Sequence, residues 1–244
     1  MIAAVFISDL HLSPDEPDIS RRFDHFLLWA QQHCVKTIYI LGDFFHAWPG
    51  DDGIDEWCKE IAKKIKSLSS KGILFYYMHG NRDFLLGEQF AKLAGWTMFD
   101  EPALIDCGEE KVMLAHGDGY CTQDVHHQRF RRLTRNRWFK RFFLFLPYFL
   151  RIRLVKAVRQ RSQSNRKPIE AMDVVEEAFL SHMQQISVNT LIHGHTHKPG
   201  VHQYEKNNRL YRRYVLSDWD DRPQLLCYDK SKGFYFNQLS LEAE

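Results

Sequence analysis

The chain has 244 residues, of which 44% are hydrophobic and 26% charged, and a formal net charge of +2. This length and composition are typical of one globular enzyme with a single core and room for an appended subdomain. No apolar run reaches the roughly 20 residues of a membrane span, and we expect no signal peptide because the first residues lead directly into an apolar run. The five cysteines form no Cys-x-x-Cys pair, so we expect reduced thiols and a cytoplasmic location.

Five short apolar runs, rich in β-branched or aromatic residues, are each followed by a polar block. In chain order these pairs are residues 3–7 with Asp9 and His11, 37–41 with Gly42-Asp43, 73–78 with Gly80-Asn81-Arg82-Asp83, 112–115 with His116-Gly117-Asp118, and 190–192 with Gly194-His195-Thr196-His197. Such runs are typical of buried strands in an α/β sheet. Ligands of open α/β sheets bind at the carboxyl ends of the strands, so the five blocks are predicted to meet in one crevice.

Seven residues of the polar blocks have the donor types of a two-metal site: Asp9, Asp43, Asn81 and the histidines His11, His116, His195 and His197. A single Asp-x-His is more often a turn or a helix cap, but five such blocks in order, each after a strand, favour metal binding. Glycines allow sharp turns and close approach, which would bring Asp43, Asn81 and His195 near a shared ion. Oxygen and imidazole donors without a thiolate favour Mn²⁺, with Fe, Co or Zn as alternatives.

Between and after these blocks, the sequence predicts further helices and strands. Helical patterns cover residues 19–33, 54–70, 87–95 and 168–186. Alternating stretches at residues 201–204, 210–216, 225–228 and 234–239 predict strands of a second, more antiparallel sheet. Strands alternating with helices in this way indicate the α/β class.

The segment from Arg129 to Lys167 concentrates the positive charge of the chain. It holds 14 of the 33 Lys and Arg residues and none of the 31 Asp and Glu residues. Large apolar side chains alternate with these charges, at spacings compatible with short amphipathic helices that break at Pro147. Because the segment lies in the long gap between the fourth and fifth blocks, we expect a helical cap over residues 120–167, inserted into a core of residues 1–119 and 168–244.

Three interpretations of this insertion compete. The first is a helical subdomain with buried aromatic residues and a solvated arginine face. The second is a nucleic-acid site in which arginines and aromatic rings bind and stack the bases. The third is a surface for an anionic amphiphile at a membrane. We favour the third, because it explains why the apolar residues and the arginines occur together.

The order of the five blocks resembles the motif order of the calcineurin-like metallophosphoesterase family, which is Asp-x-His, Gly-Asp, Gly-Asn-His-Asp/Glu, His and Gly-His-x-His. This resemblance implies a four-layer sandwich of two stacked mixed sheets flanked by helices, with the metals at one edge. It also implies the ligands of two metals, of which Asp43 bridges both. The first metal would be held by Asp9, His11, Asp43 and His197, and the second by Asp43, Asn81, His116 and His195.

The third block departs from the family pattern, because Arg82 occupies the place of the usual histidine. In family members that act on phosphomonoesters and phosphodiesters, that histidine is commonly assigned a role in assisting the leaving group. An arginine stays charged and cannot give a proton to an alkoxide, but it can clamp a phosphate with two hydrogen bonds. A leaving group that departs unprotonated is then favoured, such as a phosphate monoester with a second pKa of about 6. The substrate is therefore predicted to be a pyrophosphate.

The sequence also resembles the branch of this family that acts on UDP-2,3-diacylglucosamine in bacterial lipid A synthesis. The similarity extends through the insertion to the region of Trp219. It implies cleavage to 2,3-diacylglucosamine 1-phosphate and UMP by attack on the uridine-side phosphorus, with Arg82 and His195 stabilising the charge that develops. It also implies peripheral binding to the cytoplasmic face of the inner membrane of a Gram-negative bacterium.

The resemblance also assigns individual roles. The catalytic set is Asp43, Asn81, Arg82, His116 and His195. The substrate-binding set is Asn81, Arg82, Asp124, Ser162, Asn165, Lys167 and His195, with Ser164 as an alternative to Asn165. No nucleic acid and no obligate protein partner is expected. Two other functions remain open: a metal-dependent phosphodiesterase or pyrophosphatase for a soluble nucleotide, and a binding scaffold without catalysis, which is disfavoured because every ligand position is kept.

Overall fold

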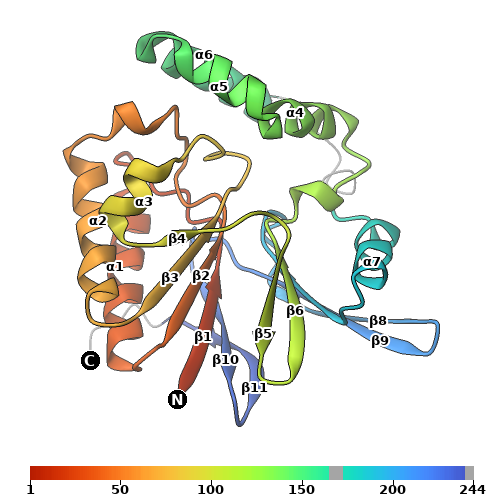
Figure 1. Ribbon diagram of the computed structural model, residues 1–244. Helices are drawn as coiled ribbons and strands as arrows, with labels where there is room; N and C mark the ends of the chain where they lie inside the picture. Colours follow the sequence, from red (N-terminus) through yellow and green to blue (C-terminus); the bar gives the residue numbers. More distant parts are fainter. Residues whose placement is uncertain (165–172, 240–244) are drawn as a thin grey trace.

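The computed structural model describes residues 1–164 and 173–239, with residues 161–164 described by their backbone alone. These residues form two stacked mixed β-sheets with helices on the outer face of each sheet (Figure 1). Three apolar clusters fill the spaces between the layers, two of them between a sheet and its helices and one between the two sheets. The predicted α/β class and its layered arrangement are therefore confirmed.

The first sheet has six strands in the order β11-β10-β1-β2-β3-β4. Its strands are β1 (Ile2–Ile7), β2 (Thr37–Leu41), β3 (Leu74–Met78), β4 (Thr97–Met98), β10 (Gln224–Asp229) and β11 (Gly233–Gln238). The strands β1 to β4 run parallel to one another, and β10 pairs antiparallel with β1 on one side and with β11 on the other. The three strands predicted before the first three polar blocks lie side by side in this sheet.

The prediction that the last four strands form a second sheet is wrong for two of them, because β10 and β11 extend the first sheet. Leu225 and Cys227 face the cluster under the helices, whereas Leu226 faces the cluster between the sheets. A strand that is apolar on both faces is stable only where both faces are covered. Beside β1, one face of β10 is covered by the helices and the other by the second sheet. This explains why β10 lies inside the first sheet.

The second sheet has five strands in the order β5-β6-β7-β9-β8. These strands are β5 (Ala103–Cys107), β6 (Glu110–Ala115), β7 (Thr190–His193), β8 (Gly200–Lys206) and β9 (Arg209–Val215). The strands β6, β7 and β9 are parallel, and β5 and β8 add antiparallel edges. The edge strand β5 was not predicted, because its partly exposed residues make no continuous apolar run.

Helices α1 (Pro17–Gln32), α2 (Glu56–Ser69) and α3 (Glu88–Ala94) cover the first sheet, and α7 (Glu176–Gln185) covers the second (Figure 1). Each has apolar residues at helical spacing, such as Phe23, Phe26 and Leu27 of α1, which are buried. A proline in the first turn starts α1. The carboxylate of Asp55 starts α2 by accepting the backbone N–H of Cys58 at 2.8 Å. Two short 3₁₀ turns, η1 (Asp51–Gly53) and η2 (Asp118–Tyr120), lie in the loops.

Three further helices lie beyond the carboxyl ends of the strands (Figure 1). We call α4 (Val125–Arg135), α5 (Arg137–Phe145) and α6 (Tyr148–Ser164) the cap helices. Asp124 and Asn136 cap α4 and α5 by accepting backbone N–H groups, and α6 begins directly after Pro147. Across the described parts of the chain, no helix is both long and apolar enough to cross a membrane.

Candidate metal centre

The carboxyl ends of β1, β2, β3, β6 and β7 meet at the edge of the sandwich that faces the cap helices (Figure 1). Backbone hydrogen bonds connect the loops that follow these strands within each sheet. The N–H of Asp9 donates to the carbonyl of Gly42 at 3.1 Å, and the N–H of Gly194 donates to the carbonyl of His116 at 2.9 Å. Across the sheets, the N–H of His195 donates to the carboxylate of Asp9 at 2.8 Å. The five polar blocks are thus brought together.

Two groups of side-chain donors are close enough to share a cation. The first group is Asp9, His11 and His197, and the second is Asp9, Asp43 and His116. Within each group the donor atoms lie within 4.8 Å of one another. All of these side chains are buried except that of His197, which is half-buried, so an ion bound there would be largely shielded from water.

The spacing of the first group fits a metal ion. Nε2 of His197 lies 3.4 Å from Oδ1 of Asp9 and 3.4 Å from Nε2 of His11. Two donors that each bind one ion at about 2.1 Å lie about 3.0 to 3.4 Å apart. Oδ1 of Asp9 is buried and accepts no hydrogen bond from the described residues. A bound cation would give this oxygen the partner that buried polar atoms require.

The second group converges in the same way. Nε2 of His116 lies 3.0 Å from Oδ1 of Asn81 and 3.7 Å from Oδ1 of Asp43. The other carboxylate oxygen of Asp43 lies 4.0 Å from Nδ1 of His11, toward the first group. A carboxylate between two donor groups is suited to contact two ions at once, which is the role that the sequence predicts for Asp43.

Outer contacts orient two of the imidazole rings. Nδ1 of His116 donates to the carbonyl of Leu41 at 2.8 Å, and Nδ1 of His197 lies 3.2 Å from Oδ2 of Asp218. Nε2 is therefore the nitrogen that faces the donor group in both rings. Metal-bound histidines are commonly held by such an outer carbonyl or carboxylate. Asp218 was not predicted, because it lies outside the five blocks and follows β9 without a recognisable motif.

The charges of the site also fit metal binding. Burial raises the pKa of Asp43 to about 6, and the neighbouring carboxylate of Asp83 adds to this effect. Burial alone would lower the pKa of His116, but Asp43 and Asp9 raise it to about 9. The pKa of His197, which burial alone would also lower, is raised by two carboxylates to about 10. Protons are thus held among these groups, and a metal ion would replace them, since it binds the deprotonated ligands.

Five predicted metal ligands have a left-handed backbone conformation. Their φ angles are 55° for Asp9, 55° for His11, 52° for Asp43, 68° for His195 and 54° for His197. Residues with a Cβ rarely adopt this conformation, which costs on the order of 1 kcal/mol or more at each position. Such strain clusters at functional sites, where the surrounding structure enforces it.

Two glycines allow the polar loops to approach one another as closely as they do. A Cβ on Gly80 would collide with the carboxylate of Asp43. A Cβ on Gly194 would collide with the side chains of Ser8 and Asp9. These contacts agree with the prediction that glycine lets the ligands gather around a shared ion.

His195 lies beside the second donor group. Its ring centroid is 5.1 Å from that of His116 and 5.3 Å from that of His127 on α4. Burial and the neighbouring His116 lower the pKa of His195 to about 3, so the ring is neutral and has a lone pair available. Its assignment as a ligand of the second metal stays a prediction.

Two guanidinium groups lie close to the donor groups. Nε of Arg82 is 3.4 Å from Oδ2 of Asp43, and Nη1 of Arg159 on α6 donates to the carbonyl of His46 at 2.7 Å. Burial and the nearby Arg82 lower the pKa of Arg159 to about 10. Nε of Arg159 is buried and has no hydrogen-bond partner among the described residues. Two adjacent cations with a spare donor suit an anionic ligand. Arg159 was not predicted, because no motif distinguishes it from the other basic residues of the insertion.

The remaining predicted substrate contacts are placed only in part. The side chain of Asp124 accepts the backbone N–H of His127 at 3.0 Å and so caps α4. The side chain of Ser162 and the whole of Asn165 and Lys167 lie outside the described residues, as does the side chain of Ser164. The substrate-binding roles of these residues stay predictions.

Four arginines of the cap helices bind the core, contrary to the interpretation of a solvated arginine face. Their side chains donate to loops that carry or lie beside predicted metal ligands. Arg131 pairs with Glu101 and Asp118, Arg135 with the carbonyl of His79 and with Glu101, Arg151 with the carbonyl of Pro49 and with Asp52, and Arg159 with the carbonyl of His46. The cap helices are therefore attached to several of the loops that carry or lie beside predicted metal ligands.

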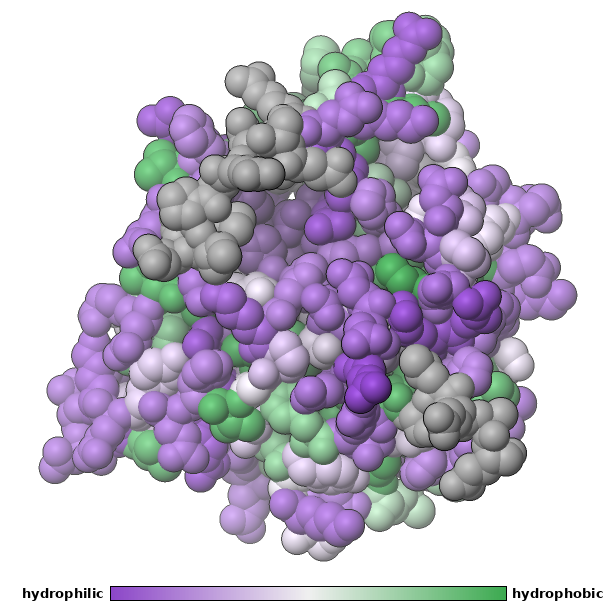
Figure 2. Space-filling view, turned by 180° about the vertical axis from the view of Figure 1, so that it is seen from behind, coloured by the Kyte–Doolittle hydropathy of each residue, from purple (hydrophilic) through white to green (hydrophobic). Residues whose placement is uncertain are grey.

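Large apolar side chains of the cap helices face solvent. Phe142 is 68% exposed, Phe145 is 89% exposed and Phe149 is 58% exposed. In Figure 2, apolar residues gather at the top of the molecule, over the cap helices. Exposed aromatic surface of this kind marks a binding or membrane surface, and it contradicts the interpretation in which these aromatic residues form a buried core.

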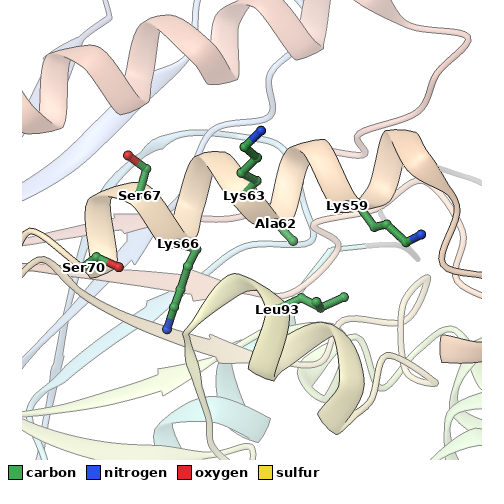
Figure 3. Close-up of a pocket in the computed structure, with 7 residues that line it drawn as sticks. All are labelled: Lys59, Ala62, Lys63, Lys66, Ser67, Ser70 and Leu93. Atoms are coloured by element: carbon green, nitrogen blue, oxygen red, sulfur yellow. The ribbon is translucent and has the colours of Figure 1, made fainter.

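A surface groove of about 350 Å³ lies elsewhere, between α2 and α3 (Figure 3). Lys59, Lys63 and Lys66 of α2 and Leu93 of α3 are among the residues that line it (Figure 3). None of its lining residues is a predicted metal ligand or substrate contact. The groove is thus separate from the metal centre, and we assign it no role.

Known proteins resemble this chain in sequence over most of its length. The family model of the calcineurin-like phosphoesterases matches residues 3–199. A protein of Ectopseudomonas mendocina named UDP-2,3-diacylglucosamine hydrolase is 42% identical over 240 residues, which cover 98% of each chain. A protein of Pseudomonas putida with the same name is 42% identical over 232 residues, or 94% of this chain and 96% of that one. Among solved structures, a dimetal phosphatase from Danio rerio has a TM-score of 0.48 and 13% identity, covering 98% of each chain.

The match over most of the chain shows that this protein belongs to the calcineurin-like phosphoesterase family. The resemblance inferred from the five polar blocks is therefore confirmed. Relatives that are 42% identical over nearly their whole length are hydrolases of a diacylated UDP-sugar by name. Because this chain and those relatives align almost end to end, the alignment includes the cap helices as well as the core.

Proposed function

We propose that the protein hydrolyses the pyrophosphate bond of UDP-2,3-diacylglucosamine and forms 2,3-diacylglucosamine 1-phosphate and UMP, a step of lipid A synthesis. The observation that carries this proposal is a two-metal donor set that lies beside two arginines and faces helices with exposed aromatic side chains. The names of the relatives support the substrate. The absence of a histidine at position 82 supports a pyrophosphate over an alkyl phosphate.

Two divalent ions, most suitably Mn²⁺, would be held by the donor groups. When bound, such ions generate hydroxide near neutral pH and fix the phosphate oxygens for in-line attack. The first ion would be held by Asp9, His11, Asp43 and His197, and the second by Asp43, Asn81, His116 and His195. Asp9 lies close to both groups, so it would add negative charge to both ions.

The arginines would bind the pyrophosphate and stabilise the charge of the transition state. Arg82 is held beside Asp43, with its Nε 3.4 Å from the carboxylate, so its position is set by a metal ligand. Arg159 supplies a second cation from the cap helices. Neither group can give up a proton, so the sugar phosphate would leave as an anion after attack at the uridine-side phosphorus. His195, neutral beside His116, would add a hydrogen bond to the reacting phosphate.

The cap helices would bind the lipid. We propose residues 120–167 as the inserted cap and residues 1–119 with 168–244 as the core. The exposed aromatic side chains of α5 and α6 would contact acyl chains and the bilayer surface, and exposed arginines such as Arg137 and Arg141 would attract anionic headgroups. This arrangement supports the proposal that the protein binds peripherally to the cytoplasmic face of the inner membrane.

The function is tested by the release of UMP from defined substrates. Purified protein with Mn²⁺ is expected to release UMP from UDP-2,3-diacylglucosamine, and much less from UDP-N-acetylglucosamine or from an aryl phosphodiester. A chelator should stop the reaction, and added Mn²⁺ should restore it. Equal rates on the acylated and unacylated UDP-sugars would indicate an enzyme for soluble nucleotides instead, and no release from any substrate would indicate a scaffold.

Arg82→Lys is expected to weaken turnover of the pyrophosphate substrate. Lysine keeps the positive charge but lacks the planar fork that holds two phosphate oxygens. Loss of one charge-assisted hydrogen bond corresponds to about 1–3 kcal/mol of transition-state stabilisation, or roughly 5- to 150-fold in kcat/KM. Arg209→Lys, at an exposed position of β9 away from the cap helices, is the matched control. Unchanged kinetics for Arg82→Lys would show that Arg82 serves the fold and not the chemistry.

A further inference from the structure

Glu101 lies between β4 and β5, and its side chain is only 8% exposed. One of its oxygens, Oε1, accepts the backbone N–H of His116 at 2.8 Å and that of Gly117 at 3.3 Å. The other oxygen, Oε2, accepts Nη2 of Arg131 at 3.0 Å and Nη2 of Arg135 at 3.2 Å. A single carboxylate therefore connects the loop of a predicted metal ligand to helix α4.

Arg131 strengthens this connection, because it reaches the same loop at a second point. Its Nε donates to the buried carboxylate of Asp118 at 3.0 Å, while its Nη2 donates to Glu101. Burial alone would lower the pKa of Arg131, but Asp118 and Glu101 raise it. The two contacts use two different nitrogens of one planar guanidinium group, which the single ammonium group of lysine cannot reproduce.

We propose that Glu101 is a positioning residue for His116 and that Arg131 and Arg135 hold Glu101 in place. The cap helices then support the metal centre as well as facing it. This inference rests on the proposed role of His116 as a metal ligand. The inference concerns the affinity of the metal site and not the choice of substrate. An experiment can therefore contradict the inference without contradicting the proposed function, and the reverse.

The physical reason lies in the contacts that hold His116. Its N–H is bound by Glu101, its Nδ1 by the carbonyl of Leu41 at 2.8 Å, and its carbonyl by the N–H of Gly194 at 2.9 Å. Removing the carboxylate of Glu101 would leave two buried N–H donors unpaired and would deprive two arginines of their shared anion. The loop would then move to satisfy these groups. Loss of outer contacts of metal ligands typically lowers metal affinity by about 10- to 100-fold.

The test is a titration of the metal-free proteins with Mn²⁺ alone, with unbound Mn²⁺ followed by electron paramagnetic resonance. We expect Glu101→Ala to bind one of two Mn²⁺ ions about 10- to 100-fold more weakly than the parent. Glu101→Gln should lose less, because its amide oxygen still accepts the N–H of His116. Arg131→Lys should also weaken the binding of one Mn²⁺ ion. Arg132→Ala is the control, since Arg132 is exposed on the same helix and makes no ion pair with the described residues.

Parental Mn²⁺ affinities in Glu101→Ala would overturn the proposal, whatever the enzymatic activity of that variant. If Glu101→Ala does not fold by circular dichroism, Arg131→Lys decides the question. Weaker binding of one ion by a folded Arg131→Lys protein supports the proposal, and parental binding overturns it. A parent protein that binds two ions but releases no UMP would contradict the proposed function and leave this inference intact.

Discussion

Asp43→Asn is expected to lower turnover of UDP-2,3-diacylglucosamine by more than about 100-fold, beyond the effect typical of outer contacts of metal ligands. Asp43 lies between the two donor groups, with one oxygen 3.7 Å from His116 and the other 4.0 Å from His11. An amide keeps the size and can still accept the N–H of Arg82, which Asp43 accepts at 2.8 Å. It lacks the negative charge that two adjacent cations need. The measurements are kcat/KM and the number of Mn²⁺ ions bound per chain.

Asp106→Asn is the matched control for this variant. Asp106 is exposed on β5 and belongs to neither donor group, so both activity and metal content should stay at the parental level. Thermal unfolding separates a folded, inactive protein from one that has lost its structure. An Asp43→Asn enzyme that keeps more than about a tenth of parental kcat/KM while folded would contradict the bridging role.

The triple variant Phe142→Ser, Phe145→Ser and Phe149→Ser is expected to bind lipid vesicles at least about 100-fold more weakly than the parent. Full burial of one phenylalanine contributes about 1.5–3 kcal/mol, so three rings in partial contact with the bilayer easily account for such a change. The three side chains are mostly exposed, so we expect the triple variant to fold. Sedimentation with vesicles that contain anionic phospholipid measures the effect, and raising the salt concentration should weaken binding of the parent as well.

Leu28→Ser is the control for the vesicle experiment, because Leu28 is 60% exposed on α1, away from the cap helices. The triple variant should still bind two Mn²⁺ ions, since its substitutions leave the arginine contacts of the cap in place. Hydrolysis of detergent-dispersed substrate should fall less than hydrolysis of substrate in vesicles. Parental vesicle binding by the triple variant would show that the membrane contact lies elsewhere on the protein.

The strands that carry the metal ligands could be predicted from local patterns. β2 occupies residues 37–41, as predicted, and β1 and β3 differ from prediction by one residue. Each combines a buried apolar run with a polar block at its end, and both features are visible within ten residues. The assignment of β10 to the first sheet could not be predicted in this way, because it depends on what covers both faces of the strand, and the covering residues are distant in sequence.

The residues of the candidate site also differ in whether a local sequence pattern predicts them. Asp9, His11, Asp43, Asn81, His116 and His197 could be named because each belongs to a short motif after a strand. Asp218, Glu101 and Arg159 could not, since each acts through contacts with residues outside its own stretch of sequence. An isolated acidic or basic residue after a strand or within a helix has no local pattern that identifies its partner.

The positive charge of the insertion predicts basic residues on its surface. It does not predict which arginines attach the cap helices to the core. The sequence predicts that its arginines attract an anionic lipid, and exposed residues such as Arg137 and Arg141 are suited to that role. Arg131, Arg135 and Arg151 instead pair with carboxylates or carbonyls of the core. Helical spacing distinguishes the faces of one helix, but which face meets the core depends on acidic groups elsewhere in the fold.

The left-handed backbone of five predicted ligands has a consequence for how this protein can change over evolution. At Asp9, His11, Asp43, His195 and His197, glycine would relieve the backbone strain and remove a donor at the same time. A substitution by glycine that makes one of these turns more stable would therefore also remove a predicted metal ligand. Stability and activity oppose each other at these positions, and gains in stability that preserve the enzyme have to come from residues away from the strand ends.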